Sequence, residues 1–220
     1  MWDYYQQYSS QIWSLFWAHT KLSIIPVVIG LIVALPLGWV AARLRWSYPP
    51  IVSIAGLLYT IPSLVLFVVM PGILGTQILD VVNVIVALSI YAVALLVRVV
   101  ADGLRSVPFE TKQAATAMGY KPVGRFFAVE LPLAVPVIAA GVRVAVVSNV
   151  SLVAVATLIG TQQLGSLISD GLAASQGGGQ WQSPLFIGII LAVVLALVLD
   201  VSVQLLTRWL TPWRRAVGRT

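Results

Sequence analysis

The sequence predicts an all-α, polytopic integral membrane protein with five core transmembrane helices and an N-terminal interfacial helix. Of its 220 residues, 60% are hydrophobic and only 9% are charged, whereas about a quarter of a typical soluble domain is charged. The mean hydropathy is +0.98, and long apolar stretches match the ~20 residues that a spanning helix needs. The chain contains no cysteine, which excludes disulfide scaffolds and thiolate chemistry. These features exclude a soluble enzyme and an independently soluble binding module.

Residues 1–19 are predicted to form an amphipathic helix that lies in the interface at the external membrane surface. The stretch Ile12–Ala18 is apolar but too short to cross a bilayer. Aromatic side chains that prefer the headgroup level surround it: Trp2, Tyr4, Tyr5, Trp13 and Trp17. A sixth, poorly formed span is the alternative. No basic segment precedes an apolar core here, so a cleaved signal peptide is not expected.

Five spans are predicted within a transmembrane domain of residues 20–210. They lie at about 22–44, 51–73, 79–101, 131–159 and 184–209. The Pro49-Pro50 pair separates the first two spans, because proline disrupts the interior of a helix. A cytoplasmic loop, residues 102–130, joins the third span to the fourth. A basic cytoplasmic tail, residues 211–220, follows the fifth.

Lysine and arginine set the predicted orientation, because they are enriched in cytoplasmic loops. With the N-terminus outside and the C-terminus inside, eleven of the 13 basic residues are cytoplasmic: Arg43, Arg45, Arg98, Arg105, Lys112, Lys121, Arg125, Arg208, Arg214, Arg215 and Arg219. The inverted topology would place these eleven outside. The sequence therefore predicts an external N-terminus and a cytoplasmic C-terminus.

The cytoplasmic loop 102–130 is predicted to contain a short, bounded helix. Ser106 is a candidate N-cap, Pro108 lies in the first turn, and Glu110 complements the positive end of the helix dipole. Gly119 is placed to end the helix. A simple connection between two spans needs about two to eight residues, and this loop is much longer. It is therefore predicted to be a docking surface, the alternative being an ordinary capped surface helix.

The loop resembles a known family of transport proteins. Gln113-Ala114-Ala115, Gly119 and Val129-x-Leu131-Pro132 follow the spacing of the motif E-A-A-x3-G-x9-I-x-L-P, which marks the membrane subunits of bacterial ATP-binding-cassette (ABC) importers. The chain departs from that motif at Gln113 and Val129. Glutamine keeps the acceptor oxygen of glutamate but lacks its charge, so a salt bridge by that side chain is not expected.

Two further segments resemble the osmoprotectant (glycine betaine, carnitine and choline) permeases of this family. They are Tyr59-Thr60-Ile61-Pro62-Ser63-Leu64 and the run from Val129 to Ile138. Leu158-Ile159-Gly160 and Leu164-Gly165 lie where those permeases have an IGAGGLG turn, although Thr161, Gln162 and Gln163 interrupt the match. The resemblance covers about residues 20–210.

This resemblance implies a type I ABC importer (MetI-like) permease fold in the bacterial cytoplasmic membrane. A partner ATPase, which carries ATP and Mg²⁺, would grip the short helix. The implied coupling residues are Glu110, Gln113, Ala114, Ala115, Gly119, Leu131 and Pro132. The chain has no G-x-x-x-x-G-K-[ST] phosphate loop, so neither catalysis nor a cofactor is expected in it.

The other implied partners are a second permease subunit (a paralogue or an identical copy), an external solute-binding protein and membrane lipid, but no nucleic acid. The implied solute is a betaine-like osmoprotectant. One alternative is a permease of the same superfamily for an amino acid or another small solute. Another is a secondary transporter driven by an ion gradient, although no inverted repeat is visible in the sequence.

Polar residues inside two spans are candidates for the translocation path: Thr60, Pro62, Ser63, Ser148, Asn149 and Ser151. Broken helices and polar side chains often flank transport paths in membranes. The alternatives are ordinary kinking at the proline and hydrogen bonding between neighbouring helices.

Two charged residues, Arg143 and Asp200, lie inside the fourth and fifth spans at similar depths. Ionisable groups are costly inside a bilayer and usually pair with one another. A structural ion pair is the favoured interpretation. Snorkelling to the surface, or a carrier role for Asp200, are the alternatives. His19 is the only histidine and has no carboxylates nearby in the sequence. It is therefore predicted to be an interfacial residue and not a metal ligand.

Overall fold

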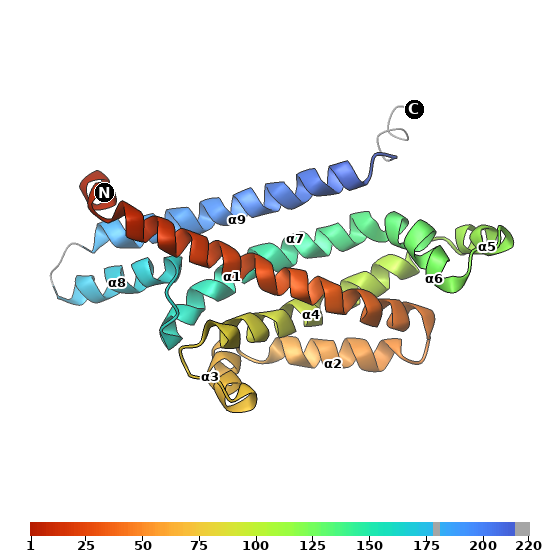
Figure 1. Ribbon diagram of the computed structural model, residues 1–220, viewed down its shortest axis with the longest axis horizontal. Helices are drawn as coiled ribbons and strands as arrows, with labels where there is room; N and C mark the ends of the chain where they lie inside the picture. The colour runs from red at the N-terminus through yellow and green to blue at the C-terminus, as the bar shows by residue number, and fades with distance from the viewer. Residues whose placement is uncertain (178–180, 214–220) are drawn as a thin grey trace.

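A computed structural model describes residues 1–177 and 181–213, which form helices joined by turns, with no strand in this part of the chain. Four long helices lie along one another: α1 (Trp2–Arg43), α4 (Val81–Arg105), α7 (Leu131–Val155) and α9 (Gln182–Leu210) (Figure 1). At one end lie the short helices α5 (Phe109–Ala117) and α6 (Pro122–Arg125), and at the other end lies α8 (Leu164–Gln176). Residues 178–180 and residues 214–220, which make up most of the predicted basic tail 211–220, lie outside the described residues.

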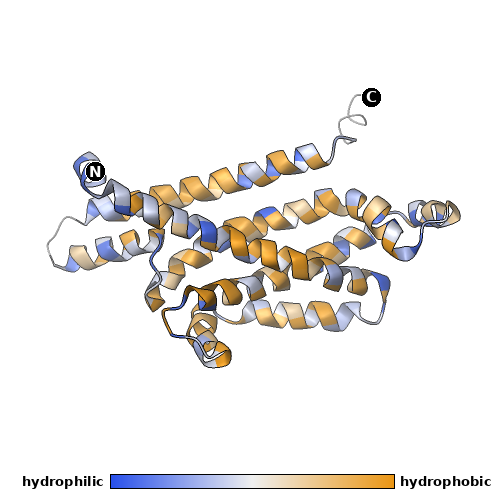
Figure 2. Ribbon diagram, in the orientation of Figure 1, coloured by the Kyte–Doolittle hydropathy of each residue, from blue (hydrophilic) through white to orange (hydrophobic). Residues whose placement is uncertain are grey.

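Apolar residues predominate along α9 and along the second half of α1, whereas the first half of α1 is more polar (Figure 2). Within the described residues, four helical stretches are long and apolar enough to cross a membrane: Trp2–Arg43, Val81–Arg105, Pro122–Ile159 and Gln182–Leu210. The pair α2 (Tyr48–Thr60) and α3 (Ser63–Leu74) supplies a fifth span if the two halves are counted together. The all-helical, multi-span fold predicted from the sequence is confirmed.

The first helix differs from the prediction, because no break separates residues 1–19 from the first span. α1 runs through both segments, with one non-helical residue at Tyr8 (φ −113°, ψ 16°). Ile12 and Leu15 are buried in a cluster with residues of α7, α8 and α9. This packing gives the N-terminal segment a protein partner on one face, while Trp13 and Trp17 stay exposed on the other. Its position relative to the membrane surface remains a prediction.

The second span, predicted over about 51–73 with Pro62 inside it, is bent by 101° between α2 and α3. Pro62 has no N–H to continue the helix, and it forces the preceding Ile61 into an extended conformation (φ −66°, ψ 129°). The break leaves the carbonyl of Ile61 without a helical donor. The hydroxyl of Tyr91 on α4 donates a hydrogen bond to that carbonyl.

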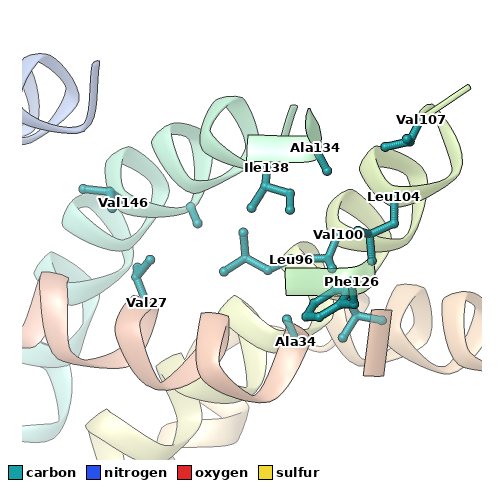
Figure 3. Close-up of a cluster of buried hydrophobic side chains, with 12 residues drawn as sticks. Val27, Ala34, Leu96, Val100, Leu104, Val107, Phe126, Ala134, Ile138 and Val146 are labelled. Carbon is teal, nitrogen blue, oxygen red and sulfur yellow. The ribbon is translucent and has the colours of Figure 1, made fainter. Parts of the chain in front are cut away.

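Glycine allows α1 and α4 to lie against each other. A Cβ atom placed on Gly30 would lie 2.4 Å from the Cβ of Ala92, and one on Gly38 would lie 2.6 Å from Cγ1 of Val100. Both distances are too short for real atoms, so larger residues would push the helices apart. More core residues come from α4 than from any other helix. Figure 3 shows one cluster of buried hydrophobic side chains to which α4 contributes. α4 is thus the central helix of the fold.

The helix α8 was not predicted from the sequence. The side chain of Gln163 accepts from the N–H of Gly165, and Ser166 reciprocates at the N-cap, which together form a capping box. Glutamine is an uncommon N-cap, and this explains why the signal was missed. Gly171 lies against the backbone of Trp181 and Leu185, so α8 packs closely on the start of α9.

Candidate coupling and translocation sites

The short helix predicted in the cytoplasmic loop is α5. It begins after Pro108 (φ −55°, ψ 141°), which occupies the N-cap position. The expectation that Ser106 caps it is wrong, because Ser106 ends α4 and donates from Oγ to the carbonyl of Gly103 at 2.8 Å. Glu110 lies in the first turn as expected. Because α5 has only nine residues, its own backbone gives it little stability, and contacts with neighbours must hold it in place.

Gly119 ends α5 with a left-handed residue, as its position predicts (φ +88°). The N–H of Gly119 donates to the carbonyl of Thr116 at 2.9 Å, and the N–H of Tyr120 donates to the carbonyl of Ala115 at 3.1 Å. These two bonds form a Schellman motif, which satisfies carbonyls at the end of a helix. A residue with a Cβ is disfavoured at this dihedral angle, so the turn itself requires glycine.

The exposed face of α5 carries the residues assigned to coupling. Glu110, Gln113 and Ala114 are exposed, whereas Ala115 is buried at 1% exposure and seats the helix on the protein. Phe109 and Met118 are 66% and 70% exposed and bracket this face with apolar surface. A shallow groove of about 480 Å³ lies alongside, lined by Phe109, Lys112, Gln113, Thr116, Ala117 and Arg125.

Leu131 and Pro132 begin α7 and follow a π-helical turn, η1 (Phe126–Glu130). Pro132 has no N–H with which to bond the carbonyl four residues earlier. The N–H of Leu131 donates instead to the carbonyl of Phe126, five residues back. Phe126 is buried in the cluster that Figure 3 shows, and its ring centroid lies 5.6 Å from that of Trp39 on α1. The Leu-Pro pair therefore sets how the loop enters α7.

Polar contacts that the sequence did not single out tie α5 to its surroundings. Nζ of Lys112 donates to the carbonyl of Leu104, at the end of α4, at 2.8 Å. Arg125 donates from Nη1 to Oγ1 of Thr116 at 2.8 Å and from Nε to Oε1 of Glu130 at 2.6 Å. Burial and the positive charge of Arg125 lower the pKa of Lys112, and Glu130 partly opposes this.

The candidates for a translocation path fall into two groups around the bend in the second span. Thr60, Pro62 and Ser63 lie at the bend itself, where Thr60 donates from Oγ1 to the carbonyl of Leu57 at 2.7 Å. Ser148 of α7 lines a cavity of about 10 Å³ next to Tyr59 and Tyr91, close to the room that one water molecule needs.

The other two candidates on α7 differ from Ser148 in their surroundings, and a role in the path remains a prediction for all three. Asn149 also borders the cavity, but it is buried and donates from Nδ2 to the carbonyl of Ser23 on α1 at 3.3 Å. Ser151 is exposed on the surface of α7. Asn149 points about 100° around the helix from Ser148, whereas Ser151, three positions after Ser148, lies on the same side of the helix as Ser148.

The sequence context of His19 predicts an interfacial residue. The structure instead buries it fully, at 0% exposure. Its ring nitrogens lie 2.9 Å from Oε1 of Gln163 and 3.0 Å from the carbonyl of Val150. Burial follows from the continuation of α1 past residue 19, which brings His19 between α7 and α8. Arg143 on α7 and Asp200 on α9 form an ion pair, which Gln204 joins through Asp200.

Comparison with known proteins places this geometry in a family. The family model described as "Binding-protein-dependent transport system inner membrane component" matches residues 34–212. The carnitine transport permease protein OpuCD of Listeria monocytogenes is 32% identical over 80% of this chain and 77% of its own. The osmoprotectant import permease protein OsmW of Salmonella typhimurium is 34% identical over 74% of this chain and 76% of its own.

Solved structures show the same fold. An inward-facing structure of the MetNI methionine ABC transporter has a TM-score of 0.79, with 21% identity, over 93% of this chain and 98% of that one. An amino acid ABC transporter with histidines has a TM-score of 0.74 at 18% identity, over 92% of this chain and 95% of that one. At these identities the likeness shows the fold alone. From the family match and the curated relatives, the chain belongs to the family of binding-protein-dependent transport system inner membrane components.

Proposed function

We propose that this chain is the permease subunit that forms the translocation path of an ABC importer for a betaine-like osmoprotectant. The observation that carries the proposal is α5, a nine-residue helix with one buried residue, Ala115, that lies beyond the ends of the long helices (Figure 1). Its exposed side presents Gln113 and Ala114 between the apolar side chains of Phe109 and Met118. An exposed apolar surface on a fixed short helix is suited to a protein partner.

In this proposal the partner at α5 is a cytoplasmic ATPase, which holds the ATP and Mg²⁺. The N-terminus is external and the C-terminus is cytoplasmic, so α5 and the basic residues near it face the ATPase. The opposite end would receive the solute-binding protein. A groove of about 600 Å³ lies there, lined in part by Lys21, Leu79 and Gln162. A second permease subunit, a paralogue or a copy of this chain, would complete the path.

The choice of solute rests on the relatives, whose names refer to carnitine, choline, glycine betaine and osmoprotectants. The side chains nearest the bend include Tyr59 and Tyr91, whose rings pack edge-to-face at 5.8 Å. Aromatic faces attract quaternary ammonium groups. An amino acid is the other candidate solute class, since the superfamily includes amino acid permeases.

Reconstitution tests the proposal directly. The complex of this chain with its ATPase and binding protein is placed in liposomes, and entry of radiolabelled glycine betaine, carnitine, choline and methionine is measured. Uptake of a betaine-like solute that needs ATP and the binding protein, and that persists with an ionophore, supports the proposal. Uptake of methionine and of none of the other three solutes would show that the solute is an amino acid and not a betaine-like osmoprotectant. Uptake that an ionophore abolishes while ATP stays high would indicate a secondary transporter and overturn the proposal.

A further inference from the structure

The π-helical turn before α7 brings together two charged residues that an α-helix would keep apart. In an α-helix the neighbours of a residue on the same face are three and four positions away. Arg125 and Glu130 are five apart, and the hydrogen bonds of a π-turn link residues five apart. Nε of Arg125 therefore reaches Oε1 of Glu130 at 2.6 Å. The Glu130 side chain is 9% exposed and that of Arg125 25% exposed, so the pair is largely shielded from water.

The same guanidinium also reaches α5, which is called the coupling helix from here on. Nη1 of Arg125 donates to Oγ1 of Thr116 at 2.8 Å, and Thr116 in turn donates to the carbonyl of Lys112 at 2.8 Å within α5. A guanidinium is planar, so its donors keep fixed directions relative to one another. Arg125 thus holds Glu130 with one nitrogen and Thr116 with another.

Little else joins α5 to α7. Ala115 is the only residue of α5 that is buried, and Glu110, Gln113 and Ala114 face outward. Lys112 bonds α5 to the end of α4 through Leu104, which is a different helix. By contrast, the chain next to Arg125 on the α7 side is fixed, because Phe126 is buried in the main core that Figure 3 shows and its ring also packs against Trp39.

We propose that Arg125 is a positioning residue that transmits displacement of α5 to α7, through Thr116 on one side and Glu130 on the other. This proposal rests on the proposed function, since it assigns the route by which an ATPase bound at α5 would move a spanning helix. α7 carries Ser148 and Asn149 beside the bend in the second span, so its movement would reach the candidate path. Without the Arg125 contact, α5 could still bind the ATPase but would move independently of α7.

The test uses the complete importer in liposomes with radiolabelled glycine betaine and measures three quantities. They are the amount of ATPase retained by the complex, the rate of ATP hydrolysis with the binding protein present, and solute imported per ATP hydrolysed. Thr116→Val removes the hydroxyl but keeps the shape of the side chain. We expect retained ATPase and continued hydrolysis, with a several-fold fall in solute imported per ATP. Thr116→Ser, which restores the hydroxyl, should recover that ratio.

Thr111→Val is the matched control, because it makes the same chemical change on α5 outside the Arg125 contact. Its ratio should equal that of the unaltered complex. Glu130→Gln is the second probe, since it keeps the acceptor oxygen and removes the charge that holds Arg125. We expect it to lower solute imported per ATP in the same direction as Thr116→Val, whether or not the amount of complex also falls.

The outcomes separate the two proposals. If the unaltered complex imports no betaine-like solute at the expense of ATP, the proposed function fails. If it does import, and Thr116→Val has the same solute-to-ATP ratio as Thr111→Val, the Arg125 proposal fails alone. A Thr116→Val complex that loses ATPase, hydrolysis and uptake in equal proportion would show that the contact only holds the fold, and this also overturns the proposal.

Discussion

The guanidinium of Arg143 and the carboxylate of Asp200 face each other in a two-point ion pair between α7 and α9. Nε lies 2.7 Å from Oδ1, and Nη2 lies 2.9 Å from Oδ2. Gln204, one turn further along α9, donates from Nε2 to the same carboxylate at 2.7 Å. Only 11% of the most apolar 18-residue stretch of α9 is buried in the protein, and the ion pair adds a polar contact to its apolar packing on α7 and α8.

Asp200→Asn is expected to lower the amount of folded subunit in the membrane, because it leaves Arg143 without a counter-charge in an apolar span. The exchange Arg143→Asp with Asp200→Arg should restore part of that amount. Immunoblots of membranes and size-exclusion profiles in detergent measure both. A well-folded Asp200→Asn subunit without uptake would instead indicate that Asp200 carries a cation or proton.

Gly119→Val should disturb the end of the coupling helix. A β-branched residue at a φ of +88° is strained, so the Schellman turn would open. Ala115→Trp should have a similar result for a different reason, since Ala115 is 1% exposed and a large ring cannot fit beneath α5. Both variants should reduce co-purification of the ATPase while the spanning helices stay folded. Gly56→Val, at a glycine with no atoms near its Cβ position, is the control.

Local sequence signals were sufficient to predict where α5 ends. Gly119 and Pro122 lie close together, and each restricts the backbone at its own position. They were not sufficient for the second span. Pro62 marks a break, but the hydroxyl that meets the freed carbonyl comes from Tyr91, on another helix. The contact of Arg125 with Glu130 was also missed, since their spacing fits only a π-turn. That turn is directly followed by Pro132, which has no N–H to donate in the first turn of α7.

Tyr91→Phe tests the bend between α2 and α3. It removes the donor to the Ile61 carbonyl and leaves a backbone acceptor unpaired in an apolar setting, which costs about 1–3 kcal/mol. We expect a lower unfolding temperature in detergent and faster proteolysis near Pro62. Tyr59→Phe keeps the ring that packs against Tyr91 and serves as the control. Equal unfolding temperatures for the two variants would mean that Pro62 alone sets the bend.

The orientation of the chain can be measured with single cysteines, because the natural sequence has none. Gln182, exposed at the start of α9, is expected to react with an impermeant thiol reagent added to intact cells once it is changed to cysteine. Lys121→Cys, exposed beside α5, should react only after the cells are opened. Labelling at position 121 in intact cells would place the coupling helix outside and exclude a cytoplasmic ATPase as its partner.

His19 joins α1 to α7 and to the start of α8 at a fully buried point. Its Nδ1 faces Oε1 of Gln163 at 2.9 Å, and its Nε2 faces the carbonyl of Val150 at 3.0 Å. The amide of Gln163 is itself oriented, since Oε1 accepts from the N–H of Gly165 at 2.5 Å and Nε2 donates to the carbonyl of Ala154 at 3.3 Å. Both ring nitrogens therefore face acceptors, and a neutral imidazole can donate to only one of them.

His19→Ala would remove the one N–H that a neutral imidazole donates and open a cavity among α1, α7 and α8. A buried acceptor that loses its donor costs about 1–3 kcal/mol, and the cavity adds to that loss. His19→Gln keeps one N–H group near the acceptors, so its loss of stability should be smaller. The unfolding temperature of the purified subunit in detergent measures this loss. We expect it to be highest for the wild type, lower for His19→Gln and lowest for His19→Ala. Lys21→Ala changes an exposed residue of the same helix, and it should unfold with the wild type. If His19→Ala also unfolded at the wild-type temperature, the contacts of His19 would not stabilise the packing of α1 on α7 and α8.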